Sequence, residues 1–394
     1  MMDALVVLML LLFGVPFSIF CFYGLALLYY GRLGSGKAKE KSEYDGNETY
    51  EPTVSVVIPT HNEEDVIAKR IDNLLASDYP KDKLKIIFVD DSSDSTPRII
   101  ERYANSSTQI RIIRFDERMG YSPCLVAGCR AAQGEVIVLA EASSLMDAKA
   151  IRHLVSNFRD PTVGVVTGKD MILNADEGAG QSESFYLRVL DFVRRAESKM
   201  DSTIYMKGEA AAVRKEVVLD LRDLEKCPGT ADTGIALLAR KKGFRAIYDP
   251  RVLFFEYAPS THHERVRQKV TRGANLIKVL WAFRSMFLRP KYGKFGMITL
   301  PINFAMLALV PLLLLGGIIV LTVLTVANPG TYLTIWIIGA CVLLFAFLFW
   351  RPVVFTFFEF EYSLLKGLYD IVFLRKSHDK IDKVISTRKF SSQV

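Results

Sequence analysis

The sequence predicts an α/β domain with a largely parallel sheet, flanked by transmembrane helices. Two observations lead to this prediction. Residues 4–31 and 295–350 are apolar and contain no charged residue, whereas the stretch between them alternates short β-branched runs with helical segments. Charged residues make up 24% of the 394 residues although the mean hydropathy is +0.21, so the charges are unevenly distributed. A single soluble domain, a disordered chain and a carrier with many spans are therefore disfavoured.

The first apolar stretch predicts a retained N-terminal transmembrane anchor, residues 1–32. It has no basic segment before it and no small-residue cleavage site, and it is long enough to cross about 30 Å of hydrocarbon. Only Asp3 precedes it, whereas four basic residues follow: Arg32, Lys37, Lys39 and Lys41. The positive-inside rule then predicts that the next domain is cytoplasmic.

The second apolar stretch is too long for one span and predicts a transmembrane hairpin within residues 295–358. Asn328, Pro329 and Gly330 divide it into helices near 297–327 and 331–350. This hairpin returns the chain to the cytoplasm. Arg351 and the basic residues of the tail agree with the charge rule: Arg375, Lys376, Lys380, Lys383, Arg388 and Lys389.

The C-terminal segment, residues 359–394, predicts an amphipathic and basic cytoplasmic tail. Apolar residues recur at helical spacing between positions 361 and 374, beside Lys366 and Asp370. This pattern is typical of a helix lying on the membrane surface. Packing of the same helix against the soluble domain explains the pattern equally well.

The five cysteines support neither a disulfide framework nor a structural zinc site. Their number is odd, two lie in apolar runs, and none forms a Cys-x-x-Cys pair. This usage is typical of scattered core residues in a reducing compartment.

Residues 50–290 predict the soluble domain. Strands are expected at 54–58, 84–89, 110–114 and 135–139, and helices at 64–76, 96–104, 122–132 and 147–158. Continuous apolar strands separated by helices indicate a parallel sheet that is covered on both faces. In such sheets, ligands bind beyond the carboxyl ends of the strands.

Polar residues follow three of these strands. The runs are 59–64 (Pro-Thr-His-Asn-Glu-Glu), 90–96 (Asp-Asp-Ser-Ser-Asp-Ser-Thr) and 141–144 (Glu-Ala-Ser-Ser). Carboxylates and hydroxyls at one sheet edge suit a nucleotide base, a ribose and a divalent cation that bridges a diphosphate. Helix capping explains each run taken singly, but three runs at strand ends favour a binding site.

These runs resemble the signatures of glycosyltransferase family 2, whose members have the GT-A fold, a Rossmann-like nucleotide-sugar domain. The resemblance covers about residues 52–290 and is carried by ordered blocks at 56–63, 89–96, 160–168, 208–214, 229–234 and 242–250. The anchors on both sides are similar to the membrane branch of the family. That branch includes synthases of hyaluronan, chitin oligosaccharides, cellulose and poly-N-acetylglucosamine, and enzymes that add one sugar to a lipid carrier.

The sequence departs from the family pattern at three places. The Asp-x-Asp metal motif is Glu141-Ala142-Ser143, and residues 120–126 lack the lysine that faces the diphosphate in many relatives. In the acceptor-side Gln-x-x-Arg-Trp motif, counted from Gln268, Thr271 replaces the arginine and Arg272 replaces the tryptophan. The loss of the tryptophan ring makes a processive polymerase less expected than the topology suggests.

The resemblance implies a role for each matched residue. Asp232 aligns with the catalytic base of the family, although helix capping is the alternative for it. The implied nucleotide-sugar residues are Pro59, Thr60, Glu63, Asp91, Arg118, Glu141 and Ser143, with Glu141 also the ligand of Mg²⁺ or Mn²⁺. Gln268 and Arg272 are expected to meet the diphosphate or the acceptor. Asp90 has a structural alternative at its strand end, and His262 and His263 are interpreted as surface residues.

The predicted function is therefore that of a membrane-embedded inverting glycosyltransferase acting at the cytoplasmic face of the cell membrane. Its expected partners are a nucleotide-diphosphate sugar, a lipid-linked or polysaccharide acceptor, and membrane lipids. Two alternatives stay open: a processive polysaccharide synthase, which would need a homo-oligomer to enclose a channel, and a silent nucleotide-sugar-binding scaffold. Nucleic-acid binding is disfavoured because no recognised module accompanies the charge of +7. Instead, residues 259–294 carry nine basic residues and one acid, next to the membrane hairpin.

Overall fold

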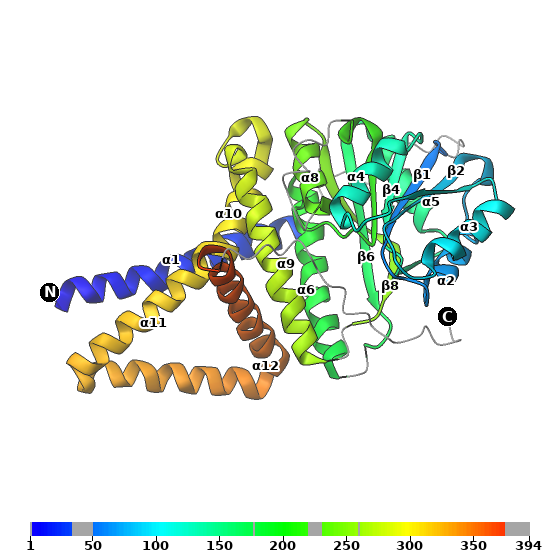
Figure 1. Cartoon of the computed structure of the whole chain (residues 1–394). Helices are drawn as coiled ribbons and strands as arrows, with labels where there is room; N and C mark the ends of the chain where they lie inside the picture. Colours follow the sequence, from blue (N-terminus) through cyan, green and yellow to red (C-terminus); the bar gives the residue numbers. More distant parts are fainter. Residues whose placement is uncertain (1, 34–49, 176–177, 220–230, 259–260, 375–394) are drawn as a thin grey trace.

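The computed structural model describes residues 2–33, 50–175, 178–219, 231–258 and 261–374. It consists of an α/β domain and a group of long apolar helices that extend from one side of it (Figure 1). The basic tail from Arg375 and the lysines at 37–41 lie outside the described residues.

An eight-stranded sheet in the order β3-β2-β1-β4-β7-β6-β8-β5 forms the centre of the domain. Its first four strands are parallel, as the apolar runs predict: β3 (Ile110–Arg114), β2 (Leu84–Asp90), β1 (Val54–Thr60) and β4 (Val136–Ala140). All seven residues of β1 are buried. Their alternation places Val57 in one core cluster and Val56 and Ile58 in the other, so both faces of the sheet are covered.

The second half of the sheet is mixed. Strand β7 (Ala210–Arg214) runs antiparallel to both of its neighbours, β4 and β6 (Val163–Ile172). Beyond β6, the long strand β8 (Arg245–Glu256) is parallel to β6, and β5 (Leu145–Met146) is antiparallel to β8 at the edge. Because β7 points the opposite way, its amino end reaches the edge where β4 ends.

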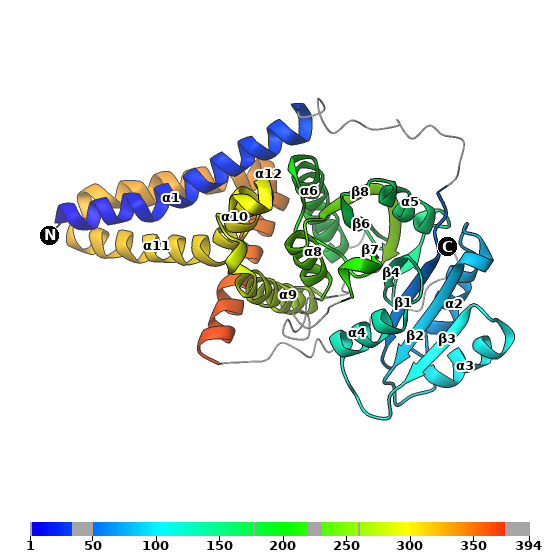
Figure 2. The ribbon, with the colours of Figure 1, turned by 90° about the horizontal axis from the view of Figure 1, so that it is seen from above.

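The helices of the domain are α2 (Ile67–Leu75), α3 (Thr96–Ser106), α4 (Tyr121–Ala131), α5 (Ala150–Ser156), α6 (Gly178–Met200), α8 (Ala231–Lys241) and α9 (His262–Ala282). Helices α2, α3 and α5 pack with one core cluster, and α4, α8 and α9 pack with the other. Helix α9 begins with a capping box formed by Thr261 and Glu264. It lies between the sheet and the apolar helices (Figure 2).

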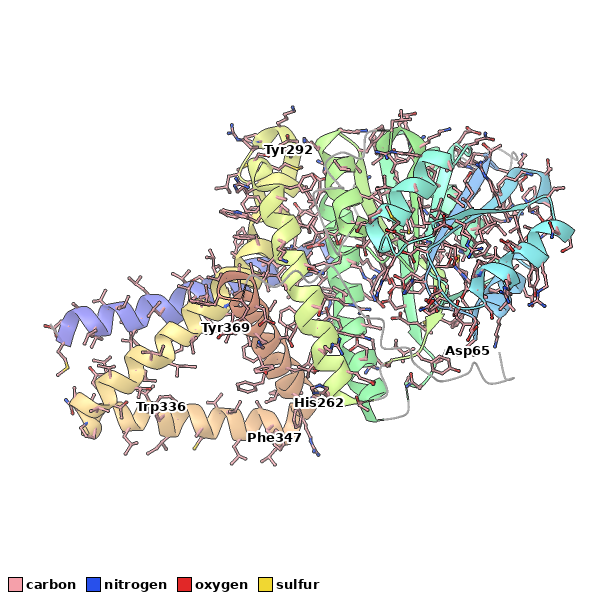
Figure 3. The ribbon with its side chains drawn as sticks, viewed as in Figure 1. Asp65, His262, Tyr292, Trp336, Phe347 and Tyr369 are labelled. Carbon is pink, nitrogen blue, oxygen red and sulfur yellow. The ribbon has the colours of Figure 1, made fainter. Side chains whose placement is uncertain are left out.

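Among the residues that the structure describes, three helices are long and apolar enough to cross a membrane: Met2–Arg32, Phe295–Ala327 and Pro329–Arg351. They contain α1 (Met2–Leu28), α10 (Leu300–Phe304), α11 (Val310–Ala327) and the first half of α12 (Pro329–Val372). Figure 2 shows α1 and α11 side by side. Figure 3 places Trp336 and Phe347 on the first half of α12, remote from the sheet. These helices support association of the chain with a membrane.

Helix α12 continues beyond the apolar stretch after a kink at Trp350, whose φ and ψ are −134° and 43°. Its second half packs against α9. A Cβ on Gly367 would lie 3.2 Å from the carbonyl oxygen of Val270, and Lys269 Nζ lies 3.4 Å from Glu359 Oε2. Of the two alternatives for residues 361–374, the structure therefore shows packing against the soluble domain.

A buried carboxylate joins this domain to the apolar helices. Glu197 of α6 is fully buried, and its oxygens accept hydrogen bonds from Tyr23 of α1, from Asn303 Nδ2 of α10 at 2.8 Å and from Thr203 Oγ1 at 2.6 Å. Asn303 Nδ2 also donates to the Tyr23 hydroxyl at 2.9 Å. We call these four residues the Glu197 cluster.

Candidate functional site

Polar residues from five segments converge around Gly208, just before β7. A Cβ on Gly208 would lie 2.8 Å from the Tyr121 hydroxyl, 3.7 Å from Glu141 Oε1 and 3.9 Å from Asp232 Cβ. Tyr121 begins α4, Glu141 follows β4 and Asp232 lies in the first turn of α8. We call the residues that surround this point the Gly208 cluster, and its members are Tyr121, Glu141, Lys207, Glu209, Asp232 and Arg272.

Asp232 is half-buried in this cluster and its protonation is perturbed. Burial raises the pKa of Asp232 to about 6; the backbone N–H of Thr233 opposes this shift and the charge of Glu209 adds to it. Lys207 and Arg272 lower the pKa by smaller amounts. A carboxylate with a pKa near 6 is ionised at neutral pH yet basic enough to accept a proton.

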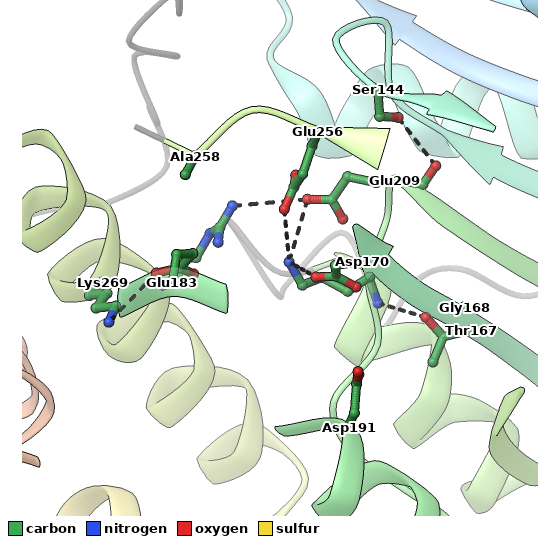
Figure 4. Close-up of polar contacts among 12 residues, drawn as sticks. Ser144, Thr167, Gly168, Asp170, Glu183, Asp191, Glu209, Glu256, Ala258 and Lys269 are labelled. Carbon is green, nitrogen blue, oxygen red and sulfur yellow. Dashed lines mark hydrogen bonds and ion pairs between the residues drawn. The ribbon is translucent and has the colours of Figure 1, made fainter. Parts of the chain in front are cut away.

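Lys207 supplies a largely buried positive charge that acts on Asp232. Its Nζ lies 2.6 Å from Asp170 Oδ2, 3.6 Å from Glu256 Oε1 and 3.9 Å from Glu209 Oε1. Figure 4 labels these three carboxylate residues. Burial alone would lower the pKa of Lys207, but these three carboxylates raise it, so the amine stays charged. Its charge is thus already shared among side chains of the protein.

Arg272 of α9 faces the same acidic groups from the opposite side. Its Nη2 lies 3.9 Å from Glu209 Oε1, and its side chain is 52% exposed. Burial would lower the pKa of Arg272, whereas Glu209 and Glu256 are the largest of the charges that raise it. Gln268 lies half-buried one turn earlier, and within the described ranges no hydrogen bond of its side chain is present. His262 and His263 are exposed at the start of α9.

The first two strand ends are joined by internal hydrogen bonds. Thr60 Oγ1 and Ser92 Oγ each donate to Asp90 Oδ1 at 2.7 Å, and all three residues are buried. Asp90 therefore connects the two strand ends, which is the structural role that the sequence left open for it. Pro59 is also buried, and the Glu63 N–H donates to Thr96 Oγ1 at 2.8 Å.

Asp91 fixes the loop that leads into Tyr121. Its Oδ2 accepts hydrogen bonds from the N–H groups of Met119 and Gly120, each at 2.8 Å, and its Oδ1 lies 2.8 Å from His61 Nδ1. Gly120 has a φ of +90°, which favours glycine at this turn. Asp91 thus holds the start of α4 against the end of β2. Arg118 is exposed on the same loop.

The turn after β4 positions Glu141. Ser144 Oγ donates to the carbonyl oxygens of Glu141 and Glu209, each at 3.5 Å, and Ser143 is exposed. Glu141 is also near Arg70, a fully buried residue of α2. Burial lowers the pKa of Arg70 to about 9, and the charge of Glu141 opposes that shift.

The donor set at this turn fits a divalent cation that is held together with a diphosphate. No group of three or more metal-type side chains occurs among the residues that the structure describes. Glu141 nevertheless offers a hard carboxylate oxygen close to Gly208. Mg²⁺ is commonly bound by one or two carboxylates plus substrate phosphates, which is the arrangement that Glu141 allows.

Several members of the site were missed by the sequence analysis. Lys207 immediately precedes the matched block 208–214 and Glu209 lies within it, and their charges could have marked them. Tyr121 lies in the run 120–126, in which only the missing lysine was considered. Glu256 and Asp170 are distant in sequence and meet Lys207 only because β6 and β8 pair side by side.

Comparisons with known proteins agree with this geometry. Residues 55–222 match the model of the family described as "Glycosyl transferase family 2". The chain is 24% identical over 263 residues to a poly-beta-1,6-N-acetyl-D-glucosamine synthase of Staphylococcus aureus (strain MSSA476), and 26% identical over 248 residues to the probable glycosyltransferase YdaM of Bacillus subtilis. These matches cover 66% and 61% of this chain, but only 63% and 59% of the relatives.

A solved structure is similar over nearly the whole chain. It is the mannosyltransferase PcManGT from Pyrobaculum calidifontis, in complex with GDP-Man and Mn²⁺. The TM-score is 0.72 and the sequence identity is 25%, over 93% of this chain and 100% of the other. The likeness therefore includes the apolar helices as well as the sheet.

Proposed function

We propose that this chain is a glycosyltransferase, a proposal supported by its match to the family 2 model and by its likeness to glycosyltransferases in sequence and structure. We propose that it moves a sugar, with inversion, from a nucleotide-diphosphate sugar to a lipid-linked or saccharide acceptor at the cytoplasmic face of a membrane. The observation that supports this proposal most strongly is the position of Asp232. Its carboxylate is half-buried with a raised pKa, beside Glu141 and within the electrostatic influence of Arg272.

In the proposed mechanism, Asp232 removes the proton from the attacking hydroxyl of the acceptor. That oxygen displaces the nucleotide diphosphate from the anomeric carbon in one step, which inverts the configuration. Such a displacement needs one protein carboxylate as base, unlike the pair of a glycoside hydrolase. The partial burial of Asp232 suits this task because it keeps the carboxylate basic near neutral pH.

The departing diphosphate is expected to lie between Arg272 and Glu141. Arg272 has an exposed guanidinium that is held toward the cluster by Glu209. Glu141 would hold Mg²⁺ or Mn²⁺, which when bound neutralises charge on the diphosphate. The presence of GDP-Man and Mn²⁺ in the similar mannosyltransferase structure supports both the donor class and the cation.

We propose that the chain is organised as anchor 1–32, catalytic domain 50–290, hairpin 295–358 and tail 359–394. The charge asymmetry around the first apolar helix supports a cytoplasmic catalytic domain. We further propose that Pro59, Thr60, Glu63, Asp91, Arg118 and Ser143 form the nucleotide side of the site, and that Gln268 lies on the acceptor side.

The test is a transfer assay with the full-length chain in lipid nanodiscs, after calorimetry against GDP-mannose and UDP-N-acetylglucosamine with Mn²⁺. Binding of one donor, followed by release of the nucleotide diphosphate, is expected. Binding without release in the presence of membrane lipid extract would instead support a scaffold. Products that lengthen with time would support the synthase that the Staphylococcus aureus relative suggests.

A further inference from the structure

One polar group of the Gly208 cluster is not used by this mechanism: the hydroxyl of Tyr121. Its oxygen is the atom nearest to the Cβ position of Gly208, at 2.8 Å. Across the parts of the chain that the structure describes, no hydrogen bond to this hydroxyl is present. A phenol in this state has a proton available for a ligand.

The surroundings of Tyr121 keep this proton in place. Burial raises the pKa of Tyr121 well above its ordinary value, and the charges of Glu141, Asp232 and Glu209 raise it further. The phenol is therefore a neutral hydrogen-bond donor at neutral pH. Its position is fixed because Asp91 holds the two preceding N–H groups of the loop.

Asp232 does not take this proton. A hydrogen bond from the phenol would favour the ionised carboxylate, but the hydrogen bond that lowers the pKa of Asp232 comes from the backbone N–H of Thr233. The two positive charges of the cluster are engaged as well. Lys207 contacts three carboxylates, and Arg272 faces Glu209.

An incoming diphosphate would therefore meet three carboxylates, Glu141, Glu209 and Asp232, and two cations that are already paired. A neutral donor stabilises an anion there without adding another charge that must be balanced. We propose that the Tyr121 hydroxyl, which lies where a side chain at position 208 would contact it, donates a hydrogen bond to the diphosphate of the sugar donor. This inference rests on the proposed function, because it assumes that the donor is a nucleotide diphosphate.

The first test removes the hydroxyl and measures nucleotide affinity by calorimetry on the full-length protein with Mn²⁺. Tyr121→Phe should weaken binding of GDP or UDP, whichever the wild type binds, by about 10- to 100-fold, the usual range for a hydrogen bond to a charged group. Binding of the corresponding monophosphate should not change. Equal losses for both nucleotides, or no loss for either, would overturn the assignment.

The second test perturbs the same hydroxyl from the side of Gly208. Gly208→Ala places a methyl group 2.8 Å from the hydroxyl oxygen but at ordinary contact distance from Glu141 and Asp232. It should displace the hydroxyl and reproduce the loss seen in Tyr121→Phe. In the double variant the clashing oxygen is absent, so the loss should be no larger than in Tyr121→Phe alone. Additive losses would show that the two residues act separately.

Two control variants separate binding from folding. Tyr103→Phe removes a tyrosine hydroxyl on α3, and Gly14→Ala adds a methyl group where no atom lies within 4 Å. Both should keep wild-type affinity, and all variants should be compared by thermal unfolding. A wild-type protein that binds neither diphosphate would overturn the proposed function itself, whereas wild-type binding with unchanged variants would overturn only the role of Tyr121.

Discussion

The Gly208 cluster and the Glu197 cluster both remove carboxylates from solvent, but different groups offset the cost of that burial in each. Asp232 and Glu197 each have a pKa that burial raises. Around Glu197 the compensation comes from neutral donors: Tyr23, Thr203 and Asn303. Around Asp232 a single neutral donor, the backbone N–H of Thr233, contributes most, and the charges of Lys207 and Arg272 add smaller amounts at longer range.

The difference separates a structural site from a reactive one. Both carboxylate oxygens of Glu197 are occupied and the residue has no exposed surface, so a ligand would gain nothing there. In the Gly208 cluster, Asp232 is half-buried, the arginine is half-exposed and a phenol proton is unused. Buried polar groups whose hydrogen bonds or charges are only partly satisfied lower the stability of the folded protein. They are therefore expected where a bound ligand supplies the missing partners.

The largest expected effect comes from Asp232→Asn. The amide cannot accept the proton of the acceptor, so the turnover number should fall by about 10²- to 10⁴-fold, the usual contribution of a general base. Nucleotide affinity should stay close to that of the wild type, because the shape is conserved. The measurements are a transfer assay and calorimetry with the nucleotide diphosphate. Wild-type turnover in this variant would exclude Asp232 as the base.

The next effect concerns stability. Glu197→Ala leaves the hydroxyls of Tyr23 and Thr203 without their acceptor and removes one acceptor of Asn303, so it should lower the free energy of unfolding by about 3 kcal/mol. Thermal unfolding in nanodiscs measures the loss, and nucleotide affinity of the folded protein should not change. A clear loss of affinity at full stability would contradict the structural role.

The same residue carries a pH signature. Because burial raises the pKa of Glu197 above its ordinary value of 4.5, the folded protein binds the proton more tightly than the unfolded chain. Its contribution to stability is then greatest at acidic pH and decreases as the pH rises through and above 4.5. Glu197→Gln should remove this part of the pH dependence, and an unchanged profile would contradict it.

The parallel half of the sheet could be predicted from sequence, whereas the Gly208 cluster as a whole could not. β1, β2 and β4 are largely apolar runs, and their ends carry the polar residues that predicted a binding site. The antiparallel direction of β7 depends on long-range pairing with β4 and β6, and only that direction brings Lys207 and Glu209 to Glu141. Likewise, Tyr23 and Asn303 lie within apolar stretches, and their role as hydrogen-bond partners of Glu197 depends on contacts between distant segments that the sequence does not reveal.

Glu141→Ala tests the cation side of the Gly208 cluster. Loss of the carboxylate should weaken Mn²⁺-dependent nucleotide binding by roughly 10- to 100-fold, the size of effect that altered metal surroundings usually have. Binding without added metal should change little. Glu117→Ala, an exposed carboxylate on the loop before α4, is the matched control. Equal affinities of wild type and Glu141→Ala across a Mn²⁺ titration would place the cation elsewhere.

The smallest effect is the pH dependence of transfer. With the pKa of Asp232 raised to about 6, the ionised base is present above that pH and is lost below it, so kcat/KM should fall roughly tenfold per pH unit on the acidic side. Because the charge of Glu209 raises this pKa, Glu209→Gln should move the acidic limb to lower pH. Arg272→Gln should move it to higher pH, since the arginine lowers the pKa. Shifts of opposite sign in these two variants would identify Asp232 as the titrating group. If the acidic limb of the pH profile moves in neither variant, another residue titrates, and the electrostatic contrast between Asp232 and Glu197 no longer holds.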